Sequence, residues 1–301
     1  MKLKKFVLAA TVGITAVTIS SVAYSQVGFL KSVKKQQLIA QGKQAYDNRC
    51  SGCHGLEGNG QGPAAQFLDP KPRDFTKAIF KFKSTPIGSM PTDDDIMRIL
   101  NQGIPGSSMP EFRLVSTDEK QAIVAYIKTF NKDAWKNQSH EDVVPHLKLP
   151  KGVFTKKDEF LKYARRGRVW YQELGCLSCH GASGEGNGPS ATTLKDSWGD
   201  DIRPANLKKD HIKRGWTVQD VAYSIMMGVD GTPMPAHIDI LDSLADQFPE
   251  VREKQYLWEL ASYVFYLRGV GAGLYEDELP AIPESGIPAD EVQAQVGKYL
   301  Q

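Results

Sequence analysis

The sequence has no large excess of charge of either sign. Its 301 residues carry 37 basic and 35 acidic side chains, which gives a formal net charge of +2. Nucleic-acid-binding proteins usually carry a basic surplus, so we expect no nucleic acid partner. Charged residues make up 24% of the chain and apolar residues 41%, which is the composition of a globular protein and not of a disordered one.

Long apolar runs are missing except at the N-terminus. There, residues 1–25 combine three lysines, an apolar run from Phe6 to Val22 and a small-x-small cleavage site at Ala23–Ser25. This order is typical of a secretory signal peptide, so we expect the mature protein in the periplasm. The alternative is an uncleaved N-terminal membrane anchor, since the run is just long enough to span a bilayer.

Cysteine is also scarce: the four that are present form two copies of one formula, "CSGCH" at 50–54 and "CLSCH" at 176–180. Four cysteines in an exported protein would ordinarily suggest two disulfides. However, two cysteines separated by two residues and followed by histidine form the attachment pattern of haem c. A thioredoxin-like dithiol or half of a zinc site is the rival interpretation. Thioredoxin motifs rarely end in histidine, and a zinc finger would place its second pair of ligands nearer.

The chemistry of haem attachment explains this spacing. Two thiols so placed can bond to the two vinyl groups of one porphyrin, and the next residue then lies under the ring as an iron ligand. The sequence therefore predicts two covalently bound haem c groups. The predicted attachment residues are Cys50, Cys53, Cys176 and Cys179, and the predicted iron ligands are His54 and His180.

The two formulas open an internal repeat. "CHGLEGNGQGPAA" begins at Cys53 and "CHGASGEGNGPSA" begins at Cys179, with four glycines and a proline in register at a shift of 126 residues. Such a density of glycine indicates a backbone that lies close to a flat group or uses positive φ, and a porphyrin edge fits both. Farther on, residues 91–110 and 216–235 each predict a short helix ended by glycine and a loop ended by Met-Pro.

With these motifs the chain resembles the class I c-type cytochromes, as two fused domains with one haem each. The resemblance covers about 36–130 and 158–268. It implies an all-α fold of tandem domains, each with three or four helices around its haem. It also implies that an N-terminal helix crosses a C-terminal helix at a glycine, for which Gly42 and Gly167 are the candidates. The expected segments are a signal peptide at 1–25, a first domain at 26–130, a linker at 131–157, a second domain at 158–268 and a tail at 269–301.

The same resemblance implies a methionine as the sixth iron ligand. Met109 and Met234 follow their histidines by 55 and 54 residues, in the matched frames "GSSMP" and "GTPMP". The proline after each methionine stiffens the loop. Met90 also precedes proline, but the second half has no counterpart to it. His237, three residues after Met234, is an alternative ligand in the second domain.

Two arginines are expected to bind haem propionates. Arg73 and Arg203 follow their histidines by 19 and 23 residues, and the second half carries a four-residue insertion around Trp198. The resemblance implies the propionate role, and a buried carboxylate does need a charge partner. The alternative is an exposed arginine. In the first domain, the C-terminal helix is expected to open with a capping box from Ser116 to Glu119.

Histidine–methionine ligation would leave no open site on the iron and would raise its reduction potential. The sequence therefore predicts an electron-transfer protein and not an enzyme, with no small-molecule substrate. Its partners would be redox proteins, as donor and acceptor, and it would act as a soluble carrier or as the haem subunit of a membrane respiratory complex. The alternative is a dihaem cytochrome c peroxidase-like enzyme, which needs one haem with a displaceable distal ligand.

Overall fold

The computed structural model describes residues 30–136, 156–215, 217–238, 255–271 and 279–300. The expected signal peptide at 1–25 and most of the expected linker lie outside these residues. The described part is helical, and its only β pairing is an isolated bridge between Lys195 and Asp201. The prediction of an all-α fold is confirmed. None of the described helices has the length and apolar character that a membrane span requires.

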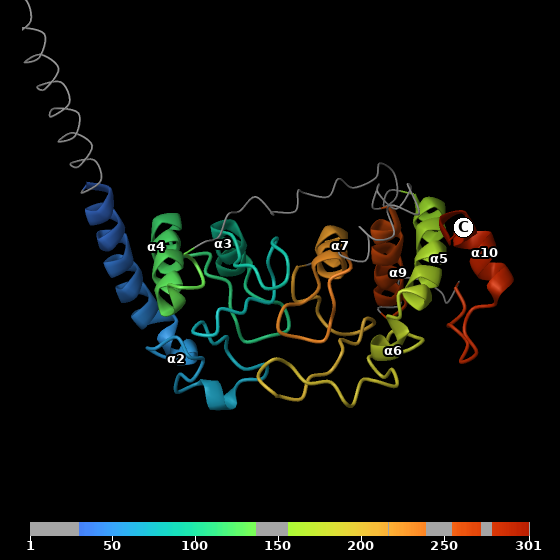
Figure 1. Cartoon of the computed structure of the whole chain (residues 1–301), viewed down its shortest axis with the longest axis horizontal. Coiled ribbons are helices and arrows are strands. Elements are labelled where there is room, and N and C mark those ends of the chain that lie inside the picture. The colour runs from blue at the N-terminus through green and yellow to red at the C-terminus, as the bar shows by residue number, and fades with distance from the viewer. Residues whose placement is uncertain (1–29, 137–155, 216, 239–254, 272–278, 301) are drawn as a thin grey trace, which may run out of the picture.

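The elements follow the repeat, and Figure 1 shows the two halves side by side. The first half contains a helix at 30–49, then α2 (Ser51–His54), η1 (Ala65–Phe67), α3 (Asp93–Gln102), α4 (Thr117–Ile127) and η2 (Lys128–Asn131). The second half contains α5 (Lys157–Glu173), α6 (Leu177–His180), α7 (Val218–Met227) and α9 (Gln255–Gly271), and α10 (Ala289–Leu300) ends the chain.

The first and last long helices of each half cross at a glycine, as expected. In the first half, a Cβ on Gly42 would lie 1.9 Å from the backbone oxygen of Ala122 in α4. In the second half, a Cβ on Gly167 would lie 2.0 Å from the backbone oxygen of Glu259 in α9. Only glycine permits so close an approach of two helices. Both halves are therefore built around the same crossing of two helices at a glycine.

The short helices α3 and α7 are also built alike. Each begins with a reciprocal capping box, from Thr92 to Asp95 in α3 and from Thr217 to Asp220 in α7. Each ends at a glycine with positive φ, which the left-handed region favours. In Figure 1 both helices lie between the outer helix pairs, toward the middle of the molecule.

The start of α4 differs from the prediction in one respect. The hydroxyl of Ser116 accepts a hydrogen bond from the Glu119 amide at 3.2 Å, as in a capping box. The carboxylate of Glu119 instead pairs with Arg49, at 2.8 Å. The tertiary ion pair takes the place of the local bond that closes a full capping box.

The C-terminal tail packs on the second half. Buried Arg168 of α5 donates to the backbone oxygens of Pro280 and Ala281 and pairs with Glu291 of α10. Figure 1 accordingly shows α5 between α9 and α10. The amide of Leu279 donates to the Tyr266 hydroxyl at 2.7 Å. The tail therefore covers the outer face of α5.

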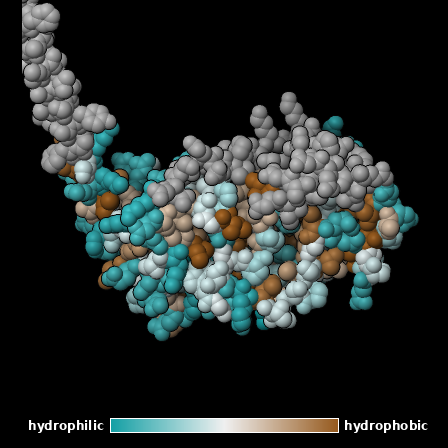
Figure 2. Space-filling view, in the orientation of Figure 1, coloured by the Kyte–Doolittle hydropathy of each residue, from teal (hydrophilic) through white to brown (hydrophobic). Residues whose placement is uncertain are grey.

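The surface of the molecule is mixed in polarity. On the face drawn in Figure 2, hydrophilic side chains and small apolar patches alternate along both halves. A few large apolar side chains are exposed, among them Leu114 and Phe67.

Candidate haem sites

Each "CxxCH" formula folds as a single helical turn. In the first half, the amides of Cys53 and His54 both donate to the Cys50 carbonyl, at 3.1 and 2.9 Å. In the second half, Cys179 and His180 repeat these bonds to Cys176 at 3.3 and 2.9 Å. One turn thus presents two thiols and an imidazole together, which is the arrangement that covalent attachment of a porphyrin requires.

A buried tyrosine anchors each turn. The hydroxyl of Tyr46 donates to the carbonyl of Gly55, and the hydroxyl of Tyr171 donates to that of Gly181, both at 2.8 Å. These tyrosines lie on the long helices that cross at Gly42 and Gly167. The crossing therefore fixes the attachment turn relative to the helix pair.

The histidine rings are oriented for ligation. Nδ1 of His54 lies 2.9 Å from the carbonyl oxygen of Arg73, and Nδ1 of His180 lies 3.0 Å from that of Ala205. A carbonyl can only accept, so Nδ1 carries the proton and Nε2 keeps its lone pair for a metal. Burial lowers the pKa of both imidazoles below their ordinary value, which favours the neutral, ligating form.

A cavity of about 350 Å³ opens in front of the first turn. Cys50, Cys53 and His54 line it together with Met109. Most of its other walls are apolar, including Phe75, Phe80, Ile96, Leu100, Phe112 and Ile127. Apolar walls, two thiols, one imidazole and one thioether match the donor set and the flat apolar body of a haem, so the residues present fit this group.

The two methionine loops have the same backbone pattern. The amide of Met109 donates to the Ser107 hydroxyl, and that of Met234 to the Thr232 hydroxyl, both at 3.2 Å. Each methionine carbonyl accepts from the amide five residues before it, at 3.1 and 3.2 Å. Met90 is buried but is not among the residues that line the first cavity. Geometry thus favours Met109 over Met90.

The cysteines do not have the electrostatics of a redox dithiol. Burial raises the pKa of Cys50 and of Cys176 to about 12, whereas a reactive dithiol needs a stabilised thiolate.

Comparison with known families decides between haem attachment and a redox dithiol. The cytochrome c family model matches residues 39–131 and 164–264. The chain belongs to the cytochrome c family. Covalently bound haem c and haem-based electron transfer go with this membership.

Similar solved structures include a chain of the "Kuenenia stuttgartiensis reducing HAO-like protein complex Kustc0457/Kustc0458". The two chains share 32% sequence identity with a TM-score of 0.64, over 75% of this chain and 95% of that chain. Comparison with curated proteins gives no match. The family match falls on both halves, so the prediction of two fused cytochrome c domains is confirmed.

The two arginines of this cytochrome differ in placement. Arg73 lines the first cavity, whereas Arg203 is exposed. The carbonyls that accept from the two histidines belong to Arg73 and Ala205, so the structural counterpart of Arg73 is Ala205. Counting from the histidines alone pairs Arg73 with Arg203 and misses this shift of register.

Sequence reasoning also missed two lysines at the first site. Lys81 and Lys213 both line the cavity beside Arg73, and Lys213 comes from the second domain. Nothing in their local sequence marks them: Lys81 reaches the site through the fold of the first domain, and Lys213 only through the packing of the two domains.

The second site carries a distinctive histidine. The amide of Phe112 donates to Leu100 at 2.8 Å, and that of His237 donates to Ile225 at 3.3 Å, so His237 stands where the first domain has Phe112. His237 is buried, and its Nδ1 has no hydrogen-bond partner in the part of the chain that the structure describes.

Proposed function

We propose that this cytochrome carries two haem c groups, each ligated by histidine and methionine, and passes single electrons between periplasmic redox proteins. The observation that carries the proposal is the first cavity, where the thiols of Cys50 and Cys53, the imidazole of His54 and the thioether of Met109 line one apolar space. The matched loops of the second half extend it to His180 and Met234.

The surrounding residues suit reversible one-electron transfer, which is the chemistry a bound haem supplies. Hydrogen bonds from Nδ1 hold both histidine rings, and prolines stiffen both methionine loops, so the ligands would stay in place in both oxidation states. Most of the cavity walls are apolar, as a haem requires, and a thioether ligand favours the ferrous state and so raises the potential.

The likeness to a chain from a protein complex supports a larger redox protein as the partner. The similar structure is described as a reducing HAO-like protein complex. We propose that this cytochrome docks likewise on a larger redox protein, as its electron donor or acceptor, after export by the N-terminal signal. Co-purification from native periplasm and membranes would identify that protein.

Volume-conserving substitutions test the ligand set. Met109→Leu should convert the first haem from low-spin to high-spin and lower its potential, while Met90→Leu, matched in chemistry, should leave the spectrum unchanged. Met234→Leu and Met227→Leu form the corresponding pair in the second domain. If Met109→Leu and Met234→Leu keep the parent spectrum, the proposed ligation is wrong.

The second candidate function is peroxidase-like catalysis at the second haem. Buried His237, three residues after Met234, is the observation that favours it, because an acid–base residue beside the distal face is what peroxide cleavage needs. Adding hydrogen peroxide to the half-reduced protein separates the two functions. The electron-transfer proposal expects no turnover, and turnover that is lost in His237→Phe would support the enzyme.

A further inference from the structure

Three cationic side chains meet at one edge of the first cavity. Arg73 and Lys81 belong to the first domain, and Lys213 belongs to the second. Burial, together with the neighbouring charges of Arg73 and Lys213, lowers the pKa of Lys81 to about 8, although Asp196 and Asp200 act in the opposite direction. The carboxylates of Asp196 and Asp200 act on Lys81 but do not offset these effects.

These cations have no hydrogen-bonded acceptor in the described part of the chain. The two other cationic residues of the cavity are already engaged. Arg49 pairs with Glu119, and Lys71 donates to the backbone oxygens of Ala65 and Gln66. An anion inside the cavity would therefore be bound by the three remaining cations, which are Arg73, Lys81 and Lys213.

The second domain reaches over this edge through its insertion. The ring of Trp198 lies 4.4 Å from the guanidinium carbon of Arg73 and 5.8 Å from Nζ of Lys81. The turn that carries Trp198 is fixed by a bond from the Trp198 amide to Asp196 at 2.9 Å and by one from the Ser197 amide to the Gly231 carbonyl at 3.1 Å. The insertion therefore serves the site of the other domain.

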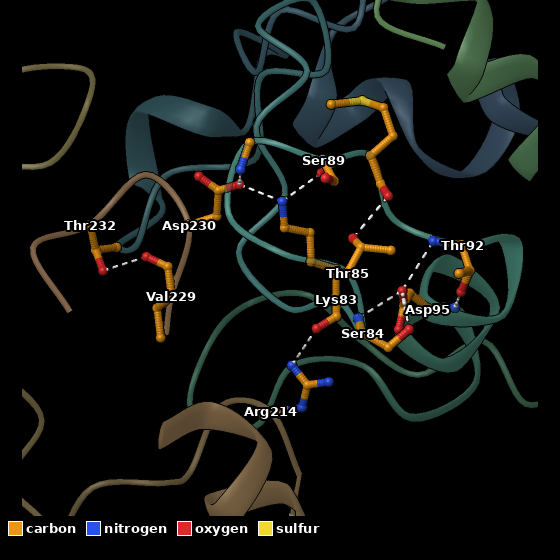
Figure 3. Close-up of polar contacts among 12 residues, drawn as sticks. Lys83, Ser84, Thr85, Ser89, Thr92, Asp95, Arg214, Val229, Asp230 and Thr232 are labelled. Atoms are coloured by element: carbon orange, nitrogen blue, oxygen red, sulfur yellow. Dashed lines mark hydrogen bonds and ion pairs between the residues drawn. The ribbon is translucent and has the colours of Figure 1, made fainter. Parts of the chain in front are cut away.

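Buried polar contacts between the domains hold Lys213 in place. Its neighbour Arg214 donates to the backbone oxygen of Lys83 at 3.0 Å and accepts on its own carbonyl from Arg98 at 2.7 Å. The ammonium of Lys83 pairs with Asp230 of the second domain at 2.5 Å, and the side chains are only 3% and 12% exposed. Figure 3 shows the contacts of Lys83 in this network, with Lys83 between Arg214 and Asp230.

We propose that the second domain completes the first haem site: Lys213 binds the propionates of the first haem together with Arg73 and Lys81, and Trp198 holds Arg73 in position. Haem carries two propionates on one edge, and their charges match an edge of three cations. The inference depends on the proposed function in one respect: the first domain must carry a haem. It makes the reduction potential of that haem depend on a residue of the other domain.

The sign of the effect follows from charge. Reduction adds an electron to the haem, so a positive charge at its propionates stabilises the ferrous form. Removing Lys213 should therefore lower the potential of the first haem. Arg73 and Lys81 remain in place, so the haem should stay bound and low-spin.

The test compares Lys213→Gln with Lys209→Gln in the complete haem-loaded protein. Lys209 is exposed, as Lys213 is, and comes from the same domain, but it does not line the cavity; its loss therefore changes the net charge equally without removing a cavity cation. Lys213→Gln should shift the ferrous-to-ferric equilibrium of the first haem about tenfold toward ferric, a fall of about 59 mV for a one-electron couple. The second haem should not move, Lys209→Gln should move neither, and Lys213→Arg should restore the parent value.

The inference is overturned if Lys213→Gln leaves the first potential unchanged in a protein with normal haem spectra, or if both lysine variants shift both haems equally. A parent protein without the first haem would overturn the proposed function as well. The haem content of the parent protein is measured before any variant is made. A missing first haem is therefore distinguished from a first haem whose potential does not depend on Lys213.

Discussion

The helix crossing at Gly42 offers a prediction whose size follows from the structure. A Cβ at this position would meet the oxygen of Ala122 at 1.9 Å, its carbonyl carbon at 2.5 Å and Cβ of Tyr126 at 2.9 Å. All three belong to the backbone or to the root of a side chain of α4, so none can rotate away. An ordinary van der Waals contact begins at 3.4 Å, so the helices would have to separate by about 1.5 Å.

The energy of Gly42→Ala is the balance of two terms. Overpacking costs about 1–3 kcal/mol and occasionally more, and a backbone clash of this depth lies at the upper end. Alanine regains about 1 kcal/mol of helix propensity. We expect a net loss of about 2 kcal/mol, which lowers the melting temperature of a domain of this size by about 8–16 °C.

Gly52→Ala is the matched control, because Gly52 lies in α2 and a Cβ there would meet nothing within 4 Å. Thermal unfolding followed by far-ultraviolet circular dichroism, on protein with verified haem content, measures both variants. Gly52→Ala should not lower the melting temperature. If Gly42→Ala is as stable as Gly52→Ala, the helices do not cross as described.

Three further predictions concern single contacts. Burial lowers the pKa of the His54 imidazole, so a proton competes less with iron for its nitrogen. The low-spin spectrum of the first haem should therefore persist as pH falls through 6.5. Conversion to high-spin at that pH would contradict this. Asp230→Asn leaves the buried ammonium of Lys83 without a counter-charge, although it still donates to the Ser89 carbonyl, and should lower the free energy of unfolding by about 3 kcal/mol in chemical denaturation. Asp133→Asn, which removes the partner of Lys136 in an exposed pair, should have a negligible effect. Tyr46→Phe removes the bond to the Gly55 carbonyl and should cost about 1–3 kcal/mol, and a loss below 0.5 kcal/mol would show that this bond does not anchor the turn.

The parts of the fold that repeat locally were predictable from the sequence. Attachment turns, helix-crossing glycines and Met-Pro loops each depend on a few residues close together in the chain, and their recurrence at a fixed shift distinguishes them from chance. The structure builds them with the same hydrogen bonds in both halves, as at Ser107 and Thr232.

Features that depend on the contact between the domains were not predictable. The insertion around Trp198 changes the register downstream, so counting residues pairs Arg73 with Arg203 although Ala205 occupies the equivalent place. Lys213 lies in no motif, and only tertiary packing brings it to the first cavity. Likewise, the sequence predicts that the Glu119 carboxylate closes a capping box, but it instead pairs with Arg49, 70 residues away.

A potentiometric titration of the haem-loaded protein, followed by its visible spectrum, tests the central claim most directly. The account predicts two one-electron steps, with both haems six-coordinate and low-spin whether oxidised or reduced. A single step from one haem, or a high-spin haem that binds an added ligand such as cyanide or carbon monoxide without displacing methionine, would contradict it.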